Sequence, residues 1–290
     1  MTLYPVGRRS AKIFSYVLFM FVSLLSRGRS RRNPTMIRSA TAFGFAVPIA
    51  LAIAIWLGPP PQSHASPRHG ADSMLEPHTA SLLVDYFETF LRSRDIEAFR
   101  RSVMIRYNEG TLERLAKSHG IQARRAAILA LGLVGSIRVN ETVAKGLRDP
   151  DPAVRNLSQS ALWAIWYRAD SPQNNASLQQ VRDLVGRERY TEAVELANQL
   201  IARAPAFAEA YNQRAIAYFS REMFAESALE CRRVLERNPY HIGALAGLGQ
   251  CYLRLDRKSD ALATFRRSLK LQPYNDGLRQ AVEELEAEVQ

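Results

Sequence analysis

Apolar residues recur every three or four positions from Thr79 onward, which is the spacing of one face of an α-helix. In the first such helix the apolar positions are Leu82, Leu83, Tyr86, Phe87, Phe90 and Leu91. Asp95 then supplies an N-cap for a second helix, whose apolar positions are Ile96, Phe99 and Val103. The pattern therefore predicts an all-α protein from Thr79 to the C-terminus.

The strongest pattern in the last part of the chain is a long repeat marked by prolines. Pro205, Pro239 and Pro273 follow one another at a constant interval, and each closes a segment with the same order of small and aromatic residues. A fixed interval of about 34 residues is typical of helix-turn-helix units in an array. Such arrays bury a continuous core by stacking their units, and they act by binding other molecules.

The last unit carries the pattern most completely, at Leu248, Gly249, Tyr252, Ala261, Phe265, Leu269 and Pro273. Units over residues 174–207 and 208–241 precede it, and all three resemble tetratricopeptide repeats. In that family small residues at the eighth and twentieth positions let two helices approach each other. The resemblance implies three stacked hairpins, and the amphipathic stretch from Gly277 to Glu288 is expected to be the capping helix.

Some positions depart from the family's pattern. Arg214 stands where the second unit usually has leucine, Cys231 replaces a late aromatic residue, and Val181 replaces a glycine or alanine of the first unit. A valine at a close helix contact overfills it, so we expect looser packing there. Cys231 and Cys251 lie on helices of adjacent units, where helix-to-helix geometry favours two buried thiols over a disulfide.

A second, shorter periodicity precedes this array. Arg124 to Val134 superposes on Arg155 to Ile165, and between them Asp151 and Pro152 supply an N-cap and a proline at the first helical position. This stretch resembles the short HEAT-like repeats first described in bilin lyases, with about two units over residues 108–168. The resemblance implies packed helical pairs that often contact other proteins.

Together the two periodicities predict a right-handed α-solenoid. Residues 79–170 are expected to form HEAT-like units, and residues 171–290 the tetratricopeptide part with its cap. Trp163, Trp166 and Tyr167 fall at helical spacing beside the boundary, where they are expected to fill a core that joins the two arrays.

The resemblance to tetratricopeptide repeats also assigns a groove, lined by the first helix of each unit. Its residues here are Arg182, Glu209, Asn212, Ile216, Phe219, Gln250, Leu253 and Arg254. Their mixture of apolar and hydrogen-bonding side chains suits a protein or peptide partner in extended or helical form. For Arg182 and Arg254 the alternative is a solvated surface cation. The carboxylate-binding places of the chaperone subclass hold Leu178, Gln213, Gly243 and Gly247, which argues against a carboxylate clamp.

The net charge of +11 is distributed unevenly along the chain. Residues 1–65 hold eight Lys and Arg and no acid, residues 66–170 hold 15 against 12, and residues 171–290 hold 16 against 16. Binding to a phosphate backbone needs clustered cations. Because the repeat array is neutral, the sequence argues against a nucleic-acid partner.

The basic leader contains an uncharged apolar stretch from Ala40 to Gly58, preceded by arginines and followed by Ser63-His64-Ala65. Read from Met36, it predicts a signal peptide cleaved after Ala65. The alternative is an uncleaved anchor over Ala40 to Gly58 with the arginines in the cytoplasm. Both interpretations place the folded part in the periplasm or cell envelope, and contact with the membrane is expected only through this segment.

Residues 66–78 are expected to be a linker, because so polar a stretch cannot bury enough apolar surface to order itself. The histidines at 64, 69 and 78 lie in or beside it, and His119 and His241 stand singly at helix ends, where capping or solvation explains them. No metal-ligand set, cofactor motif or catalytic constellation is recognisable in the sequence.

Two hypotheses for function follow from the sequence. The first is a non-catalytic scaffold or adaptor of the cell envelope that binds a peptide or protein segment in the tetratricopeptide groove. The alternative is an accessory subunit or lyase-like enzyme that uses the HEAT-like segment to hold a ligand near Trp163 and Trp166.

Overall fold

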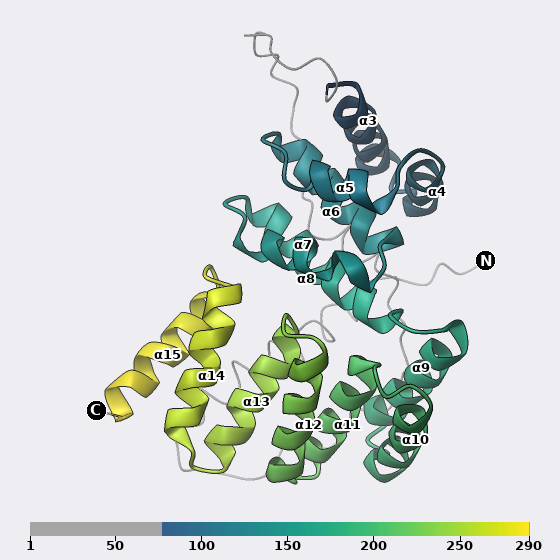
Figure 1. Cartoon of the computed structure of the whole chain (residues 1–290). Coiled ribbons are helices and arrows are strands. Elements are labelled where there is room, and N and C mark those ends of the chain that lie inside the picture. The colour runs from purple at the N-terminus through teal and green to yellow at the C-terminus, as the bar shows by residue number, and fades with distance from the viewer. Residues whose placement is uncertain (1–76, 290) are drawn as a thin grey trace, which may run out of the picture.

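The computed structural model describes residues 77–289, which fold into helices joined by short turns (Figure 1). Within this range there is no β-strand, and the predicted all-α class is confirmed. No helix among these residues is both long and apolar enough to cross a bilayer. The predicted leader, with its apolar segment, and most of the predicted linker lie outside the described residues.

Six helices and two 3-10 turns form the N-terminal part. They are α3 (Pro77–Ser93), α4 (Ile96–Arg106), α5 (Glu109–Leu115), α6 (Ile121–Val134), η2 (Ile137–Val139), α7 (Asn140–Lys145), η3 (Gly146–Arg148) and α8 (Pro152–Tyr167). α3 therefore begins shortly before the predicted start of this domain. The predicted caps are present, since the side chains of Asp95 and Asp151 accept hydrogen bonds from the amides of Ala98 and Val154.

The starting residues of these helices follow the shorter of the two repeat intervals found in the sequence. The step from Glu109 of α5 to Asn140 of α7 equals the step from Ile121 of α6 to Pro152 of α8. The two long helices approach closely at Gly132, where an added Cβ would lie 2.8 Å from that of Ala161. The helix positions agree with the interval, and the assignment to HEAT-like repeats stays a prediction.

Seven helices form the C-terminal part, in three pairs and a cap. They are α9 (Pro172–Gly186), α10 (Tyr190–Arg203), α11 (Ala208–Ser220), α12 (Phe224–Arg237), α13 (Ile242–Arg254), α14 (Lys258–Leu271) and α15 (Asp276–Val289). Each repeat proline stands just after the end of a second helix, because proline has no N–H to continue it. In the third pair an added Cβ at Gly249 would overlap the ring of Phe265, so only glycine permits this helix approach.

The turns inside the three pairs share one conformation. Glu188, Glu222 and Asp256, which occupy equivalent positions of the three units, have φ of 61°, 60° and 56°. In the second pair the amide of Met223 donates to the carbonyl of Tyr218 at 3.0 Å, and the equivalent bonds close the other two turns. This is the Schellman arrangement that ends a helix in the left-handed region, here with acidic residues where glycine is usual.

Departures from the family's pattern have specific packing solutions. Arg214 forms an ion pair with Glu230 at 2.6 Å in which both side chains are largely buried. Val181 is fully buried in a cluster with small neighbours, Ala193, Ala197 and Ala217. The thiols of Cys231 and Cys251 are buried and free, as expected from helix geometry.

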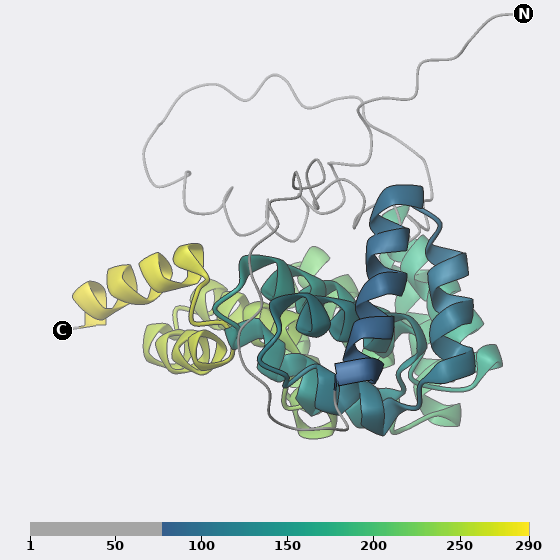
Figure 2. The same cartoon turned by 90° about the horizontal axis from the view of Figure 1, so that it is seen from above.

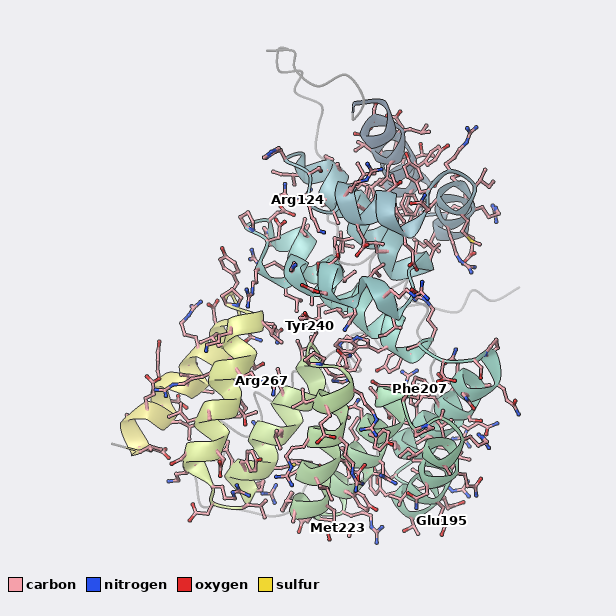
Figure 3. All side chains as sticks on the ribbon, viewed as in Figure 1. Arg124, Glu195, Phe207, Met223, Tyr240 and Arg267 are labelled. Carbon is pink, nitrogen blue, oxygen red and sulfur yellow. The ribbon has the colours of Figure 1, made fainter. Side chains whose placement is uncertain are left out.

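The two parts share one core. Figure 1 shows α9 to α15 side by side in a row, with the helices of the N-terminal part stacked above it, and Figure 2 shows the same assembly from above. Ile242 of the repeat part belongs to the same buried cluster as Trp166 and Leu131 of the N-terminal part, and Tyr240 packs against it (Figure 3). The predicted role of the α8 aromatics in joining the arrays is confirmed.

Candidate functional site

The first helices of the three pairs are α9, α11 and α13, and they form one face of the array, in which α11 contacts both α9 and α13. The resemblance to tetratricopeptide repeats assigns the groove to this face. The structure divides the predicted groove residues into two sets. Glu209 and Asn212, near the start of α11, and Arg182 of α9 pack against α8, whereas the residues toward the C-terminal ends of α11 and α13 remain accessible.

Glu209 and Asn212 belong to the covered set. Their exposed fractions are 1% and 4%, so neither lines an open groove as the sequence predicted. The carboxylate of Glu209 accepts hydrogen bonds from the side-chain amides of Asn212 at 2.8 Å and Gln213 at 2.7 Å. An ionised carboxylate is stable in such a place only when its oxygens are hydrogen-bonded, and these amides meet that need.

His241 supplies the third donor to this carboxylate. Its Nδ1 atom lies 2.9 Å from the amide of Ala244 and caps α13, and its Nε2 atom lies 2.9 Å from Oε2 of Glu209. Because Nδ1 accepts a hydrogen bond from an N–H group, the ring proton must be on Nε2, which then donates to Glu209. The expectation of capping at His241 is confirmed, whereas that of solvation is wrong, since the side chain is fully buried.

The indole of Trp166 stacks on the His241 ring, with 4.2 Å between centroids and 18° between planes. Its Nε1–H donates to Oδ1 of Asn140 at 2.8 Å, and the side-chain amide of Asn140 donates to Oδ1 of Asn238. Hydrogen bonds thus link buried residues of α7, of α8 and of the turn between α12 and α13. This polar chain fixes how the N-terminal helices sit on the repeats.

Trp163 covers the start of α13 because residue 243 is glycine. An added Cβ at Gly243 would lie 2.6 Å from Cη2 of Trp163. The Trp163 ring also stacks on Tyr167, with centroids 5.6 Å apart. The aromatic face of α8 therefore packs against residues of the same chain.

Arg182 is neither a groove cation free to meet a partner nor a solvated one. Its guanidinium lies 3.8 Å from the centre of the Tyr167 ring and donates to Oε1 of Gln179 at 2.8 Å. Burial raises the pKa of Tyr167 above its ordinary value, and the charge of Glu209 adds to that effect. Tyr167 thus remains a neutral phenol against which the cation packs.

The accessible set begins one turn further along the first helices. The side chain of Ile216 on α11 is 37% exposed. Phe219 on the same helix, and Gln250 and Leu253 on α13, are half-buried. Arg254 is exposed, and its guanidinium lies 4.2 Å from the centre of the Phe224 ring. These residues, Ile216, Phe219, Gln250, Leu253 and Arg254, which we call the open half-groove, combine an apolar surface with an amide and a cation.

Sequence reasoning did not find the buried chain through Asn140, Trp166, Asn238, His241 and Glu209. Trp166 was expected in the core between the two arrays, and two other members carried a signal. His241 stands at an N-cap position, and Glu209 is an acid at a groove position shortly before two amide residues. Neither signal could be read as burial, because the covering helix α8 comes from another part of the chain.

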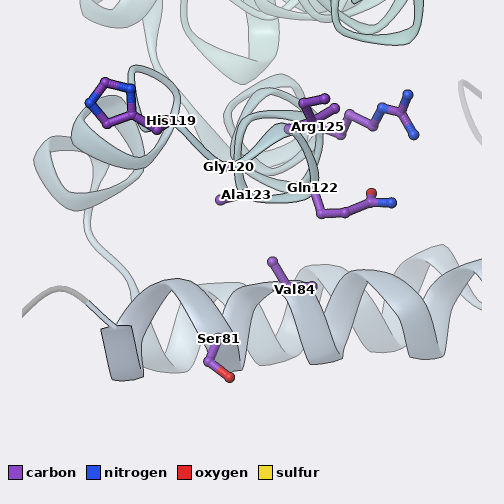
Figure 4. A pocket seen from close by; sticks show the side chains of 8 residues that line it. Ser81, Val84, His119, Gly120, Gln122, Ala123 and Arg125 are labelled. Carbon is purple, nitrogen blue, oxygen red and sulfur yellow. The ribbon is translucent and has the colours of Figure 1, made fainter. Parts of the chain in front are cut away.

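A hollow of about 680 Å³ lies between α3 and the start of α6 (Figure 4). Its wall contains Ser81, Val84, His119, Gly120, Ile121, Gln122, Ala123 and Arg125. Arg125 is engaged elsewhere, by two hydrogen bonds to the carboxylate of Asp151. The described residues of the wall include no acid.

The described helices define a helical-repeat protein with one partly accessible apolar face. A sequence model of the tetratricopeptide repeat matches residues 178–242 and 232–276. Residues 178–276 therefore match the tetratricopeptide repeat, and the predicted repeat assignment is confirmed for that region.

Relatives share this region at low identity. Hsp70-Hsp90 organizing protein 1 of Glycine max is 25% identical over 150 residues, and a TPR repeat-containing protein of Rhizobium etli is 27% identical over 126 residues. The matches cover 50% and 43% of this chain, and they span 25% and 61% of those proteins. The chain thus matches only part of either relative.

Solved structures with similar helices include two complexes. One is the first TPR of Spaghetti (RPAP3) bound to the HSP90 peptide SRMEEVD, with a TM-score of 0.39 and 20% identity over 41% of this chain and 95% of that chain. Another is the TPR2AB domain of yeast Sti1 with pHSP90, with a TM-score of 0.37 and 15% identity over 72% and 99%.

Proposed function

We propose that this protein is a non-catalytic scaffold of the cell envelope, and that it binds a segment of a partner protein in the open half-groove. The observation that carries the proposal is the exposure of Ile216 and its neighbours on the face formed by α11 and α13. This face belongs to tetratricopeptide repeats, and it is accessible toward the C-terminal ends of α11 and α13.

The chemistry of this surface describes the segment it would accept. Ile216, Phe219 and Leu253 offer an apolar strip for two or three side chains of a short helix or extended peptide. Gln250 offers a donor and an acceptor for the peptide backbone, and Arg254 offers a charge for an acidic residue. A partner segment with alternating apolar and acidic residues fits this arrangement.

A terminal carboxylate clamp is not part of the proposal. Gln213, one of its expected places, is buried and donates to Glu209. Leu178 is buried beside Tyr167, and Gly243 lies under Trp163. A chain terminus could not reach these positions while α8 covers them.

The envelope location rests on the leader alone. Its apolar stretch, preceding arginines and small residues near Ala65 support export by a cleaved signal or an anchor. Cell fractionation followed by N-terminal sequencing tests this. Recovery from the cytoplasm with Met1 intact would contradict the location.

Site-specific photo-crosslinking tests the groove. A photoreactive residue replaces Ile216 in one variant, and in a control it replaces Leu229, which is 41% exposed but lies on the second helix α12. We expect a defined crosslinked partner at 216 that is absent at 229, and its binding should weaken about tenfold in Ile216→Asp. Equal crosslinking at the two positions, or unchanged affinity of Ile216→Asp, would overturn the assignment.

A further inference from the structure

The outer face of α4 carries the two most exposed large apolar side chains among the described residues. Met104 is 59% exposed and Ile105 is 78% exposed. They are adjacent in sequence and lie on the side of α4 opposite Phe99 and Val103, which are buried. Single exposed apolar residues are ordinary, but a neighbouring pair this accessible has a cost in water.

α4 cannot turn this face inward. Its buried side is fixed by aromatic contacts to α3, with 5.8 Å between the ring centroids of Phe90 and Phe99 and 6.4 Å between those of Phe87 and Phe99. Its start is capped by Asp95. The apolar pair is therefore held outward by a rigid support.

Two arginines border the pair. Arg100 and Arg101 lie one helical turn before Met104 and Ile105, and both are exposed. Glu97, which is also exposed, lies one turn before Arg101 on the same side of the helix. Within the described residues Arg101 has no ion pair, and Arg100 has one contact of 3.4 Å to Glu97. The face thus combines apolar side chains with a net positive charge.

We propose that this face of α4 docks on an anionic lipid bilayer, with Met104 and Ile105 entering the headgroup region and the arginines lying against lipid phosphates. Exposed apolar side chains bordered by cations are the chemistry by which a helix lies in a membrane interface. Each cation near an anionic surface adds to attraction, and two apolar side chains alone hold a protein weakly. The face therefore suits a contact that a second attachment reinforces.

The course of the chain supports a bilayer over a soluble partner. The described structure begins at Pro77 in α3, and α3 packs directly on α4. In Figure 1 these two helices form the end of the molecule away from α15. In the alternative interpretation of the leader as an uncleaved anchor, the apolar segment ends at Gly58, so a stretch of chain that can extend to at most about 65 Å separates it from α3. A protein attached there would present α4 close to the surface.

Fluorescence at position 105 in the full chain tests the proposal. Ile105→Cys is labelled with an environment-sensitive dye, since Cys231 and Cys251 are buried, and the unsubstituted chain measures background labelling. Leu229→Cys on α12 is the matched control. Each protein is reconstituted into phosphatidylcholine vesicles with or without phosphatidylglycerol, and nitroxide-bearing lipids serve as quenchers.

We expect lipid quenching at 105 in vesicles with phosphatidylglycerol, little at 229, and loss of quenching at 105 in pure phosphatidylcholine or at high salt. Arg100→Glu with Arg101→Glu should lower the docked fraction of this face about tenfold. The comparisons of salt and lipid composition use the protein without the arginine substitutions. They therefore test the proposal even if the doubly substituted protein unfolds. Equal quenching at 105 and 229, no dependence on anionic lipid, or a spectral shift at 105 without quenching, as in self-association, would each overturn the proposal.

The result of the quenching experiment does not depend on whether the open half-groove binds a partner. A chain that crosslinks through Ile216 but shows no quenching at 105 retains the proposed scaffold function and loses only the bilayer contact. The reverse result would support docking by α4 and leave the groove without a partner.

Discussion

The Nε2 atom of His241 lies 2.9 Å from a carboxylate oxygen of Glu209, and both side chains are fully buried. This bond joins the start of the third repeat to the first helix of the second. Its histidine is also the N-cap of α13 and the stacking partner of Trp166. His241 therefore caps α13, donates a hydrogen bond to a buried carboxylate and packs against the N-terminal part.

Replacement of the buried acid should destabilise the protein. Glu209→Gln exchanges one accepting oxygen for an amide that faces donors from Asn212, Gln213 or His241. We expect the free energy of unfolding in urea to fall by about 2–3 kcal/mol. Glu195→Gln, an exposed change on α10, serves as control and should alter it by less than about 0.5 kcal/mol. Similar values for the two variants would show that the buried hydrogen bonds are not formed.

Gly243→Ala should disturb the junction between the two parts. Its Cβ would lie 2.6 Å from Trp163, and neither the start of α13 nor α8 can retreat without opening a buried core. We expect a loss of about 1–3 kcal/mol in the free energy of unfolding. Adding Trp163→Phe to the Gly243→Ala variant should restore part of the lost free energy of unfolding. Gly186→Ala, where no other atom lies within 4 Å of the new Cβ, should be neutral or stabilising by up to about 1 kcal/mol.

Glycine should stabilise the turn inside the second repeat. Glu222 has φ of 60°, a conformation that costs an L residue about 1–2 kcal/mol. Glu222→Gly removes that cost but gains entropy in the unfolded chain, so we expect a net stabilisation of about 0.5–1 kcal/mol in thermal or urea unfolding. Glu222→Ala removes the same charge and keeps the unfavourable conformation. If the two variants were equally stable, the left-handed turn would not be the cause.

Asp151 should make stability depend on pH in the acid range. Its bidentate hydrogen bond to Arg125 holds the pKa of the Asp151 carboxyl below its usual value, and the same carboxylate caps α8. A lowered folded-state pKa contributes stability above the unfolded-state pKa of about 4, and that contribution is lost as pH falls through the folded-state value. Asp151→Asn should therefore cost about 2 kcal/mol near pH 7.

Urea unfolding of both proteins between pH 7 and pH 2 measures this effect. The difference between wild type and Asp151→Asn should narrow as pH falls below about 4. Asp276→Asn changes an exposed carboxylate, and its free energy of unfolding should differ little from that of the wild type between pH 7 and pH 2. A constant gap for Asp151→Asn would mean that packing and not ionisation gives Asp151 its effect.

Local features of the fold could be predicted because their causes are local. Pro152 after Asp151 begins a helix, Pro239 follows the end of another, and Gly249 faces Phe265 across a helix pair, all as the sequence indicates. Each depends on a backbone group or a contact within one repeat. The left-handed turn at Glu222 could not be predicted, since an acidic residue is not a typical signal for positive φ.

The groove could be predicted only in part. The family pattern assigns Ile216 to an accessible face, and the structure leaves it exposed. The same pattern assigns Glu209 to that face, and the structure buries it under α8. The difference arises because the repeat pattern describes an isolated array. It contains no information about a helix from another part of the chain that packs across the array.

The sequence by itself determined the all-helical class, the repeat interval, the helix ends and the residues of each first helix, because periodicity, capping and proline act within a few residues of each other. Only the tertiary structure decided which groove residues are free, what His241 binds and why residue 243 is glycine. Those facts depend on contacts between segments as far apart as Asn140 and Asn238. Such contacts form when two buried surfaces match in shape and hydrogen bonding, which no single stretch of sequence encodes.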